Sequence, residues 1–163
     1  MTSSSNSHSL RGLLGWLLLV FAVAALGAMA SVQAQAFYAQ LSKPSWAPPA
    51  GVFGPVWSVL YGLMGMAVWL VWRARPAAHS AFVLFGAQLA VNALWSWLFF
   101  AWKQGALAML DVVVLWVLIA ATMRVFWPIH RLAALLLLPY FMWVGFASLL
   151  TWVIWQGNPG LLS

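Results

Sequence analysis

Residues 81–102 read AFVLFGAQLAVNALWSWLFFAW and carry no charged side chain. As an α-helix, a run of this length crosses the ~30 Å hydrocarbon core of a bilayer at about 1.5 Å per residue. Four similar apolar runs occupy residues 12–32, 53–72, 105–127 and 132–155. The sequence therefore predicts an all-α integral membrane protein, a five-transmembrane-helix bundle forming one domain over residues 10–158.

The composition supports lipid as the main solvent. The 163 residues are 66% hydrophobic and 5% charged, whereas soluble domains carry about 25% charged residues. The net charge of +6 comes from basic residues scattered between apolar runs, so we expect contacts with anionic headgroups and no nucleic-acid binding. Without cysteine there is no disulfide and no thiol nucleophile.

The expected topology rests on the N-terminal segment and on the distribution of basic residues. Residues 1–9 are small and polar and are predicted to be a disordered tail. The run after Arg11 resembles a signal peptide but exceeds the roughly 7–15 apolar residues of one, which favours a retained helix. Most cations lie on the N-terminal side of the membrane, which predicts an inside N-terminus in a bacterial cell membrane.

The connector 33–52 is the longest between apolar runs. Pro44, Pro48 and Pro49 prevent a helix over residues 43–49. Beyond them, Trp57 and Tyr61 are four residues apart and share a helix face. Two interpretations are open, a stiff connector with an interfacial Trp46 and a lid over an aromatic wall.

A polar stripe runs along residues 81–102. Gln88, Asn92, Trp95 and Phe99 follow helical spacing, and unpaired amides are costly in hydrocarbon, so the stripe must face protein or a ligand. Interhelical hydrogen bonds explain Gln88 equally well, whereas Asn92 and Trp95 favour a cavity.

The last two runs hold further candidates. Asp111, the one carboxylate, is either a functional intramembrane acid or, as we favour, an anion at the positive end of a helix near Lys103. Pro139 is expected to kink its helix. Beyond it, Trp143, Ala147 and Leu150 share a face that fits either a recessed wall or plain packing.

Conventional catalytic groups are missing. His8, His79 and His130 lie in the tail or connectors, so none is expected to ligate haem in the bundle or to form a metal site. The chain has no carboxylate pair and no Ser/His/acid set. Catalysis by side chains is therefore poorly supported, and no covalently bound cofactor is expected.

Five strings together resemble one family. They are KPSWAPP (43–49), FGPVWSVLY (53–61), AQLAVNALWSWLFF (87–100), ALAMLDVVVLW (106–116) and PYFMWVGFASLLTWVIWQGN (139–158). In this order they resemble the TspO/MBR family (translocator protein, tryptophan-rich sensory protein, peripheral-type benzodiazepine receptor), and the chain is similar to its bacterial members.

The resemblance implies a homodimeric bundle whose cavity is capped by the first loop. Its ligands would be porphyrins such as protoporphyrin IX, benzodiazepine-type and isoquinoline compounds, and in animal members sterols. Sterol binding here should be weak, because Trp152 and Gln156 replace the Tyr and the basic residue of the sterol motif. The implied pocket residues are Trp46, Trp57, Tyr61, Asn92, Trp95, Trp143, Ala147 and Leu150.

The leading hypothesis is a membrane receptor or transporter-like protein for tetrapyrroles. One alternative is light- and oxygen-dependent porphyrin degradation, in which Trp57 and Trp143 quench or relay the oxidant. The other is a proton-coupled exporter of small molecules that uses Asp111. A dimer seam is expected along Gly86 and Ala90, whose small side chains permit close helix approach.

Overall fold

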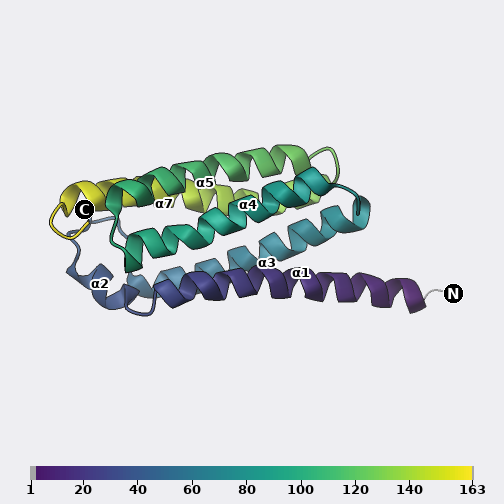
Figure 1. The fold of residues 1–163 in the computed structure, drawn as a ribbon, viewed down its shortest axis with the longest axis horizontal. Helices are drawn as coiled ribbons and strands as arrows, with labels where there is room; N and C mark the ends of the chain where they lie inside the picture. The colour runs from purple at the N-terminus through teal and green to yellow at the C-terminus, as the bar shows by residue number, and fades with distance from the viewer. Residues whose placement is uncertain (1–2, 163) are drawn as a thin grey trace.

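The computed structural model describes residues 3–162, with side chains from residue 9 onward. Its helices are α1 (Ser3–Ala30), α2 (Ala34–Gln40), α3 (Ala50–Ala74), α4 (His79–Ser96), η1 (Trp97–Ala101), α5 (Gly105–Phe126), α6 (Arg131–Leu136) and α7 (Leu138–Gly157). Over these residues, five segments are long and apolar enough to cross a membrane. The predicted five-helix bundle is therefore confirmed (Figure 1).

Helix α1 changes neighbours along its length. Near its N-terminus it packs on α3, where Gly12 lies directly against the ring of Trp72 and Leu17 fills the space beside Gly65. Near its C-terminus it packs on α4 and η1, where the indole N–H of Trp97 donates to the carbonyl of Leu26 at 3.2 Å. The two ends of α1 are thus held by different helices.

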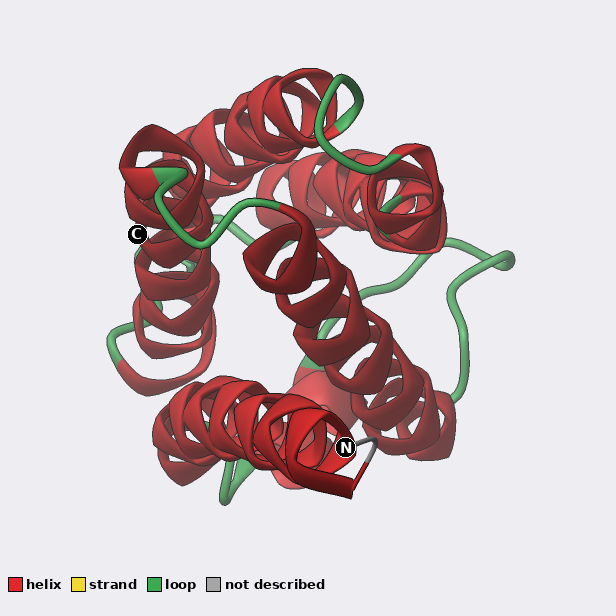
Figure 2. Ribbon diagram, turned by 90° about the vertical axis from the view of Figure 1, so that its right-hand side faces the viewer, coloured by secondary structure: helices red, strands yellow, loops and turns green. Residues whose placement is uncertain are grey.

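The other helices complete the bundle. α5 packs against α4 and α7, while α3 packs against α1, α2 and α6. Figure 2 shows this arrangement nearly end-on. Across the centre of the bundle, Trp57 of α3 packs against Tyr140 of α7, with ring centroids 6.1 Å apart.

Two segments near the N-terminus differ from the sequence predictions. α1 begins at Ser3, so residues 3–9 are helical where a disordered tail was expected; residues 1–2 lie outside the described part. The indole of Trp69 donates to the carbonyl of Ser9 at 2.9 Å and attaches this end to α3. The connector 33–52 contains the helix α2, which was not predicted and lies before Pro44, outside the segment that the prolines keep from being helical.

The last apolar run is divided, as Pro139 predicts. α6 ends at Leu136 and α7 begins at Leu138, with Pro139 in its first turn. A proline interrupts the helical hydrogen-bond ladder but is tolerated in a first turn. Where a kink was expected, the run is therefore interrupted at Leu137, between two helices.

The end of the third run is a π-helical turn, η1. The amide of Trp102 donates to the carbonyl of Trp97 at 2.8 Å, which is a five-residue hydrogen bond. Phe99 and Phe100 stand edge to face on this turn, with centroids 5.1 Å apart. Such turns are rare in proteins, and many of those that occur lie at functional sites.

Candidate ligand-binding cavity

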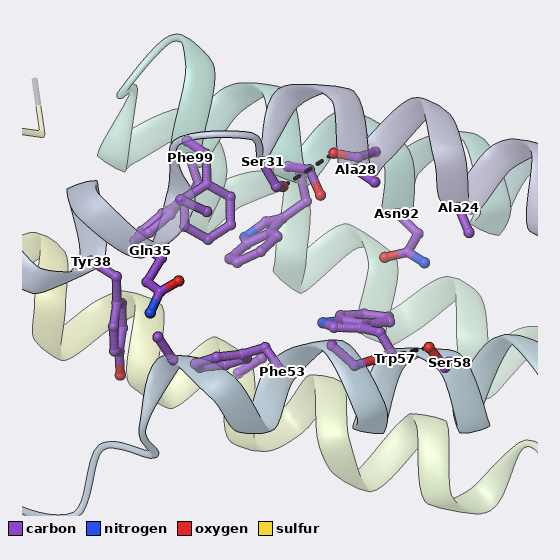
Figure 3. A pocket seen from close by; sticks show the side chains of 18 of the residues that line it. Ala24, Ala28, Ser31, Gln35, Tyr38, Phe53, Trp57, Ser58, Asn92 and Phe99 are labelled. Carbon is purple, nitrogen blue, oxygen red and sulfur yellow. Dashed lines mark hydrogen bonds between the residues drawn. The ribbon is translucent and has the colours of Figure 1, made fainter.

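A cavity of about 620 Å³ lies between α1, α3, α4, η1 and α7, with α2 at one end (Figure 3). Pockets for small molecules usually measure roughly 300–1,000 Å³. Eight aromatic residues line it: Phe21, Tyr38, Phe53, Trp57, Tyr61, Trp95, Phe99 and Phe100. Among the described residues, no charged side chain lines it.

The aromatic rings form two facing walls. On α3, Trp57 and Tyr61 lie 5.7 Å apart between centroids. On the opposite side, Trp95 stacks on Phe99 at 5.1 Å and nearly parallel, with 12° between the planes. Figure 3 shows Phe53 and Trp57 on one side of the space and Asn92 and Phe99 on the other. A flat ligand between the walls would meet ring faces on both sides.

The polar groups of the cavity are few and mostly paired. The Asn92 side-chain amide donates to the Tyr61 hydroxyl at 3.0 Å, and this buried bond joins α4 to α3. The hydroxyls of Ser31 and Ser58 donate to the backbone carbonyls of Gly27 and Gly54, one helical turn earlier in the chain. Within the described chain, the indole N–H of Trp95 is buried and has no hydrogen-bond acceptor.

Six of the eight residues expected in the pocket line this cavity. They are Trp57, Tyr61, Asn92, Trp95, Ala147 and Leu150. That they bind a ligand stays a prediction.

Trp46 and Trp143 lie outside the cavity lining. Trp46 is 45% exposed and stands edge-on to Phe146 at 5.8 Å. Trp143 lies behind the wall, against Phe53 at 6.0 Å. Each therefore supports or neighbours the wall without forming it.

Two further candidates also lie away from the lining. Gln88 is fully buried, and neither polar atom of its amide has a hydrogen-bond partner in residues 9–162. Asp111 is 8% exposed, and one carboxylate oxygen is likewise unpartnered there. The Lys103 ammonium, expected near Asp111, lies instead 5.0 Å from the centre of the Phe37 ring.

Sequence reasoning missed the wall formed by α1 and α2. Ala24 and Ala28 of α1, Ser31 just after it, and Gln35 and Tyr38 of α2 all line the cavity. No polar stripe marks this part of α1. The available signal was the concentration of small residues over 22–30, AVAALGAMA, which leaves space beside a helix.

The α2 end of the cavity is held by several hydrogen bonds. The Tyr38 hydroxyl, whose pKa is raised by burial, donates to the carbonyl of Pro48 at 2.9 Å. The Lys43 ammonium donates to the carbonyls of Tyr38 and Leu41 at 2.7 and 2.9 Å. Residues 41–49 contribute nothing to the lining, so the cap is formed by α2 and the proline-rich segment braces it.

A second brace joins the C-terminal end of α7 to the first connector. Asn158 is 7% exposed. Its side-chain oxygen accepts from the Ser42 amide at 2.7 Å, and its nitrogen donates to the Ser42 carbonyl at 2.9 Å. The same nitrogen donates to Ile154 at 2.7 Å. Asn158 therefore fixes the start of the proline-rich segment to α7.

Comparison with known proteins agrees with this architecture. The chain matches the TspO/MBR family over residues 16–156. It is 41% identical over 127 residues to "Tryptophan-rich protein TspO" of Chlorobaculum tepidum, covering 76% of this chain and 80% of the relative. It is 38% identical over 128 residues to the human "Translocator protein", covering 76% of each chain.

A third relative extends the match. The chain is 37% identical over 137 residues to the "Tryptophan-rich sensory protein" of Cereibacter sphaeroides, covering 82% of this chain and 86% of the relative. The matched range contains all the cavity-lining residues. Because that range spans most of the sequence and carries the five apolar helices, the chain belongs to the TspO/MBR family of integral membrane proteins.

Proposed function

We propose that the protein is a receptor or transporter-like membrane protein that binds tetrapyrroles, such as protoporphyrin IX, and similar flat hydrophobic ligands. The observation that carries this proposal is the cavity of about 620 Å³ between two aromatic walls. A conjugated macrocycle presents two faces to such walls. Each aromatic contact contributes about 0.5–1.5 kcal/mol beyond area burial.

The cavity also suggests how a porphyrin would be oriented. No charged side chain of the described residues lines it, and the nearby Lys43 ammonium is held by backbone carbonyls of residues 38 and 41. Burying an unpaired carboxylate is strongly unfavourable. The propionates should therefore lie at the α2 end, near exposed Gln35, while the apolar body of the macrocycle lies between the walls.

Fluorescence quenching by protoporphyrin IX tests the proposal. Replacing Trp57 with leucine removes one wall contact and should weaken binding about 2- to 12-fold, from 0.5–1.5 kcal/mol. Trp127→Leu is the matched control, since Trp127 is 49% exposed and outside the lining. Equal affinities for both variants and the unaltered protein would exclude this cavity as the porphyrin site.

Light-dependent porphyrin degradation is a second candidate, favoured by one feature. Trp57 forms part of the cavity wall, and Trp143 packs behind Phe53, so two indoles lie near any bound macrocycle. Porphyrin loss under illumination in air should fall in Trp57→Phe and in Trp143→Phe. Loss at the same rate in both variants and without protein removes this candidate. The position of Asp111 outside the lining gives no comparable support to proton-coupled export.

The assembly and orientation are also proposed. Gly86 and Ala90 are exposed on α4, and a side chain added at Gly86 would meet nothing within 4 Å, so this face is free to pack on a second copy. We also propose that the protein lies in a bacterial cell membrane with its N-terminus on the inner side, because most Lys and Arg residues lie on that side. Cross-linking after Ala90→Cys, in a chain that has no other cysteine, checks the seam.

A further inference from the structure

The cavity has an opening on the side of the bundle, between α1 and α3. Its exposed lining residues on α1 include Phe21, Ala25 and Ala28, and those on α3 are Gly54 and Ser58. Figure 3 shows Ala24 and Ala28 of α1 across the open space from Trp57 and Ser58 of α3. We call this opening, defined by these five exposed residues, the α1–α3 mouth.

The path of α1 explains the mouth. The N-terminal half of α1 contacts α3 at Gly65, but the C-terminal half contacts α4 and η1 instead, where Gly27 faces Ser96. The hydrogen bond from Trp97 to Leu26 holds it there. Small residues on this stretch of α1 leave the space beside α3 unfilled. The mouth therefore exists because the C-terminal half of α1 packs on α4 and η1 and not on α3.

The mouth lies at the depth of the hydrocarbon. Phe21 is nine residues from the end of its span at Ala30, or roughly 14 Å of helix, and Ser58 is eight residues from the start of its span at Ala50, or roughly 12 Å. A bilayer's hydrocarbon is about 30 Å thick. The mouth thus extends from near one interface toward the middle of the membrane, where acyl chains surround it.

The α2 end is less open to exchange than the mouth. Hydrogen bonds from Tyr38, Lys43 and Asn158 brace α2 and the proline-rich segment. Entry from water through this end would break several of them. Entry through the mouth breaks no hydrogen bond that the described residues make across it.

The chemistry of the lining selects the occupant. Water needs two to four polar partners to remain in a cavity, and three donors of this mostly apolar lining are already used: Ser31 and Ser58 donate to backbone carbonyls one turn earlier, and Asn92 donates to Tyr61. An empty cavity loses dispersion contacts along its whole lining. An acyl chain supplies those contacts, and it leaves one apolar medium for another.

We propose that an acyl chain of a bilayer lipid occupies this cavity through the α1–α3 mouth in the ligand-free protein, and that ligands exchange with it by the same route. The inference concerns the cavity of the proposed function. It holds whether or not the ligand is a porphyrin, because it depends only on the mouth, the lining and the surrounding lipid.

Photo-cross-linking in vesicles tests it. The full chain is reconstituted in phosphatidylcholine that carries a diazirine within one acyl chain, illuminated, and digested for mass spectrometry. We expect labels on the inner-wall residues Trp95, Ala147 and Leu150. Outward-facing Leu18 and Val83, which are 72% and 73% exposed, report labelling from the bulk lipid. Labels on the outward residues alone would overturn the proposal.

A variant pair on α3 tests the route. A side chain added at Gly54 or at Gly62 meets nothing within 4 Å, so both glycines accept a larger residue, but only Gly54 lines the cavity. Gly54→Phe should reduce inner-wall labelling severalfold relative to the outward residues, and Gly62→Phe should not. Equal inner-wall labelling in the two variants would refute entry through the mouth.

Protoporphyrin IX distinguishes this inference from the proposed function. If the porphyrin binds in the cavity, adding it before illumination should remove the inner-wall labels. Porphyrin binding with the inner-wall labels intact would refute exchange between ligand and acyl chain. Inner-wall labels in a protein that binds no porphyrin would support the acyl chain and reject the tetrapyrrole proposal.

Discussion

Replacing Asn158 with alanine should release the proline-rich segment from α7. The change removes the two hydrogen bonds that the side chain makes with the Ser42 backbone, at 2.7 and 2.9 Å. A neutral hydrogen bond contributes about 0.5–1.5 kcal/mol net, so the two together contribute about 1–3 kcal/mol. The free energy of local opening around Ser42 should therefore fall by that amount, and opening should become more frequent.

Hydrogen exchange measures this opening directly. At tenfold per 1.4 kcal/mol, the Ser42 amide should exchange about 5- to 140-fold faster in Asn158→Ala. Values near the lower limit are expected, because Ser42 is exposed and water can replace the lost partner. Asn158→Asp, which keeps an acceptor for the Ser42 amide but loses the donor, should lie between the alanine variant and the unaltered protein.

Gln156→Ala is the matched control for this experiment. Gln156 lies two residues before Asn158, in the last turn of α7, and its side chain is exposed. Exchange at Ser42 should be unchanged in this variant. If Asn158→Ala exchanges at Ser42 no faster than Gln156→Ala, the brace contributes nothing, and the reasoning that the α2 end is held closed fails.

Three further predictions concern the helices themselves. Tyr61→Phe leaves the buried amide of Asn92 without its acceptor and should destabilise the protein by about 1–3 kcal/mol; thermal unfolding in detergent, followed by circular dichroism, should show a lower midpoint. Gly105→Ala forces a methyl group against an indole ring of α7 and should cost about 1–3 kcal/mol, whereas Gly15→Ala, in open space, should be neutral or stabilising in the same assay. Asp111→Asn should leave porphyrin quenching unchanged, because the carboxylate does not line the cavity; a severalfold loss of affinity would place Asp111 in the binding path.

The spans were predictable because they depend on local composition. A continuous apolar run of sufficient length must be a helix in lipid, since its backbone polar groups have no other partners there. The α3, α4 and α7 walls could also be predicted from the sequence, because helical spacing places Trp57 with Tyr61 and Asn92 with Trp95 on shared faces. Both features depend on residues that lie only a few positions apart.

The rest of the site depends on contacts between distant segments. Ser42 and Asn158 are separated by 116 residues, and neither residue type announces the pairing. Beyond Gly27, α1 follows α4 because the two helices pack closely at Ser96. No local sequence pattern indicates this contact. Trp46 and Trp143 were placed in the pocket by residue type and resemblance, but the side that each ring faces is decided by neighbours such as Phe146 and Phe53.

The wide turn at η1 affects how this chain is compared with its relatives. A π turn contains one more residue than an α turn, so everything before it is rotated by about 100° relative to an uninterrupted α-helix. A relative without the turn should therefore align with a single-residue gap within 97–101. If that gap were ignored, the correspondence would shift by one position, and Phe99 would be equated with a residue about 100° away around the helix axis.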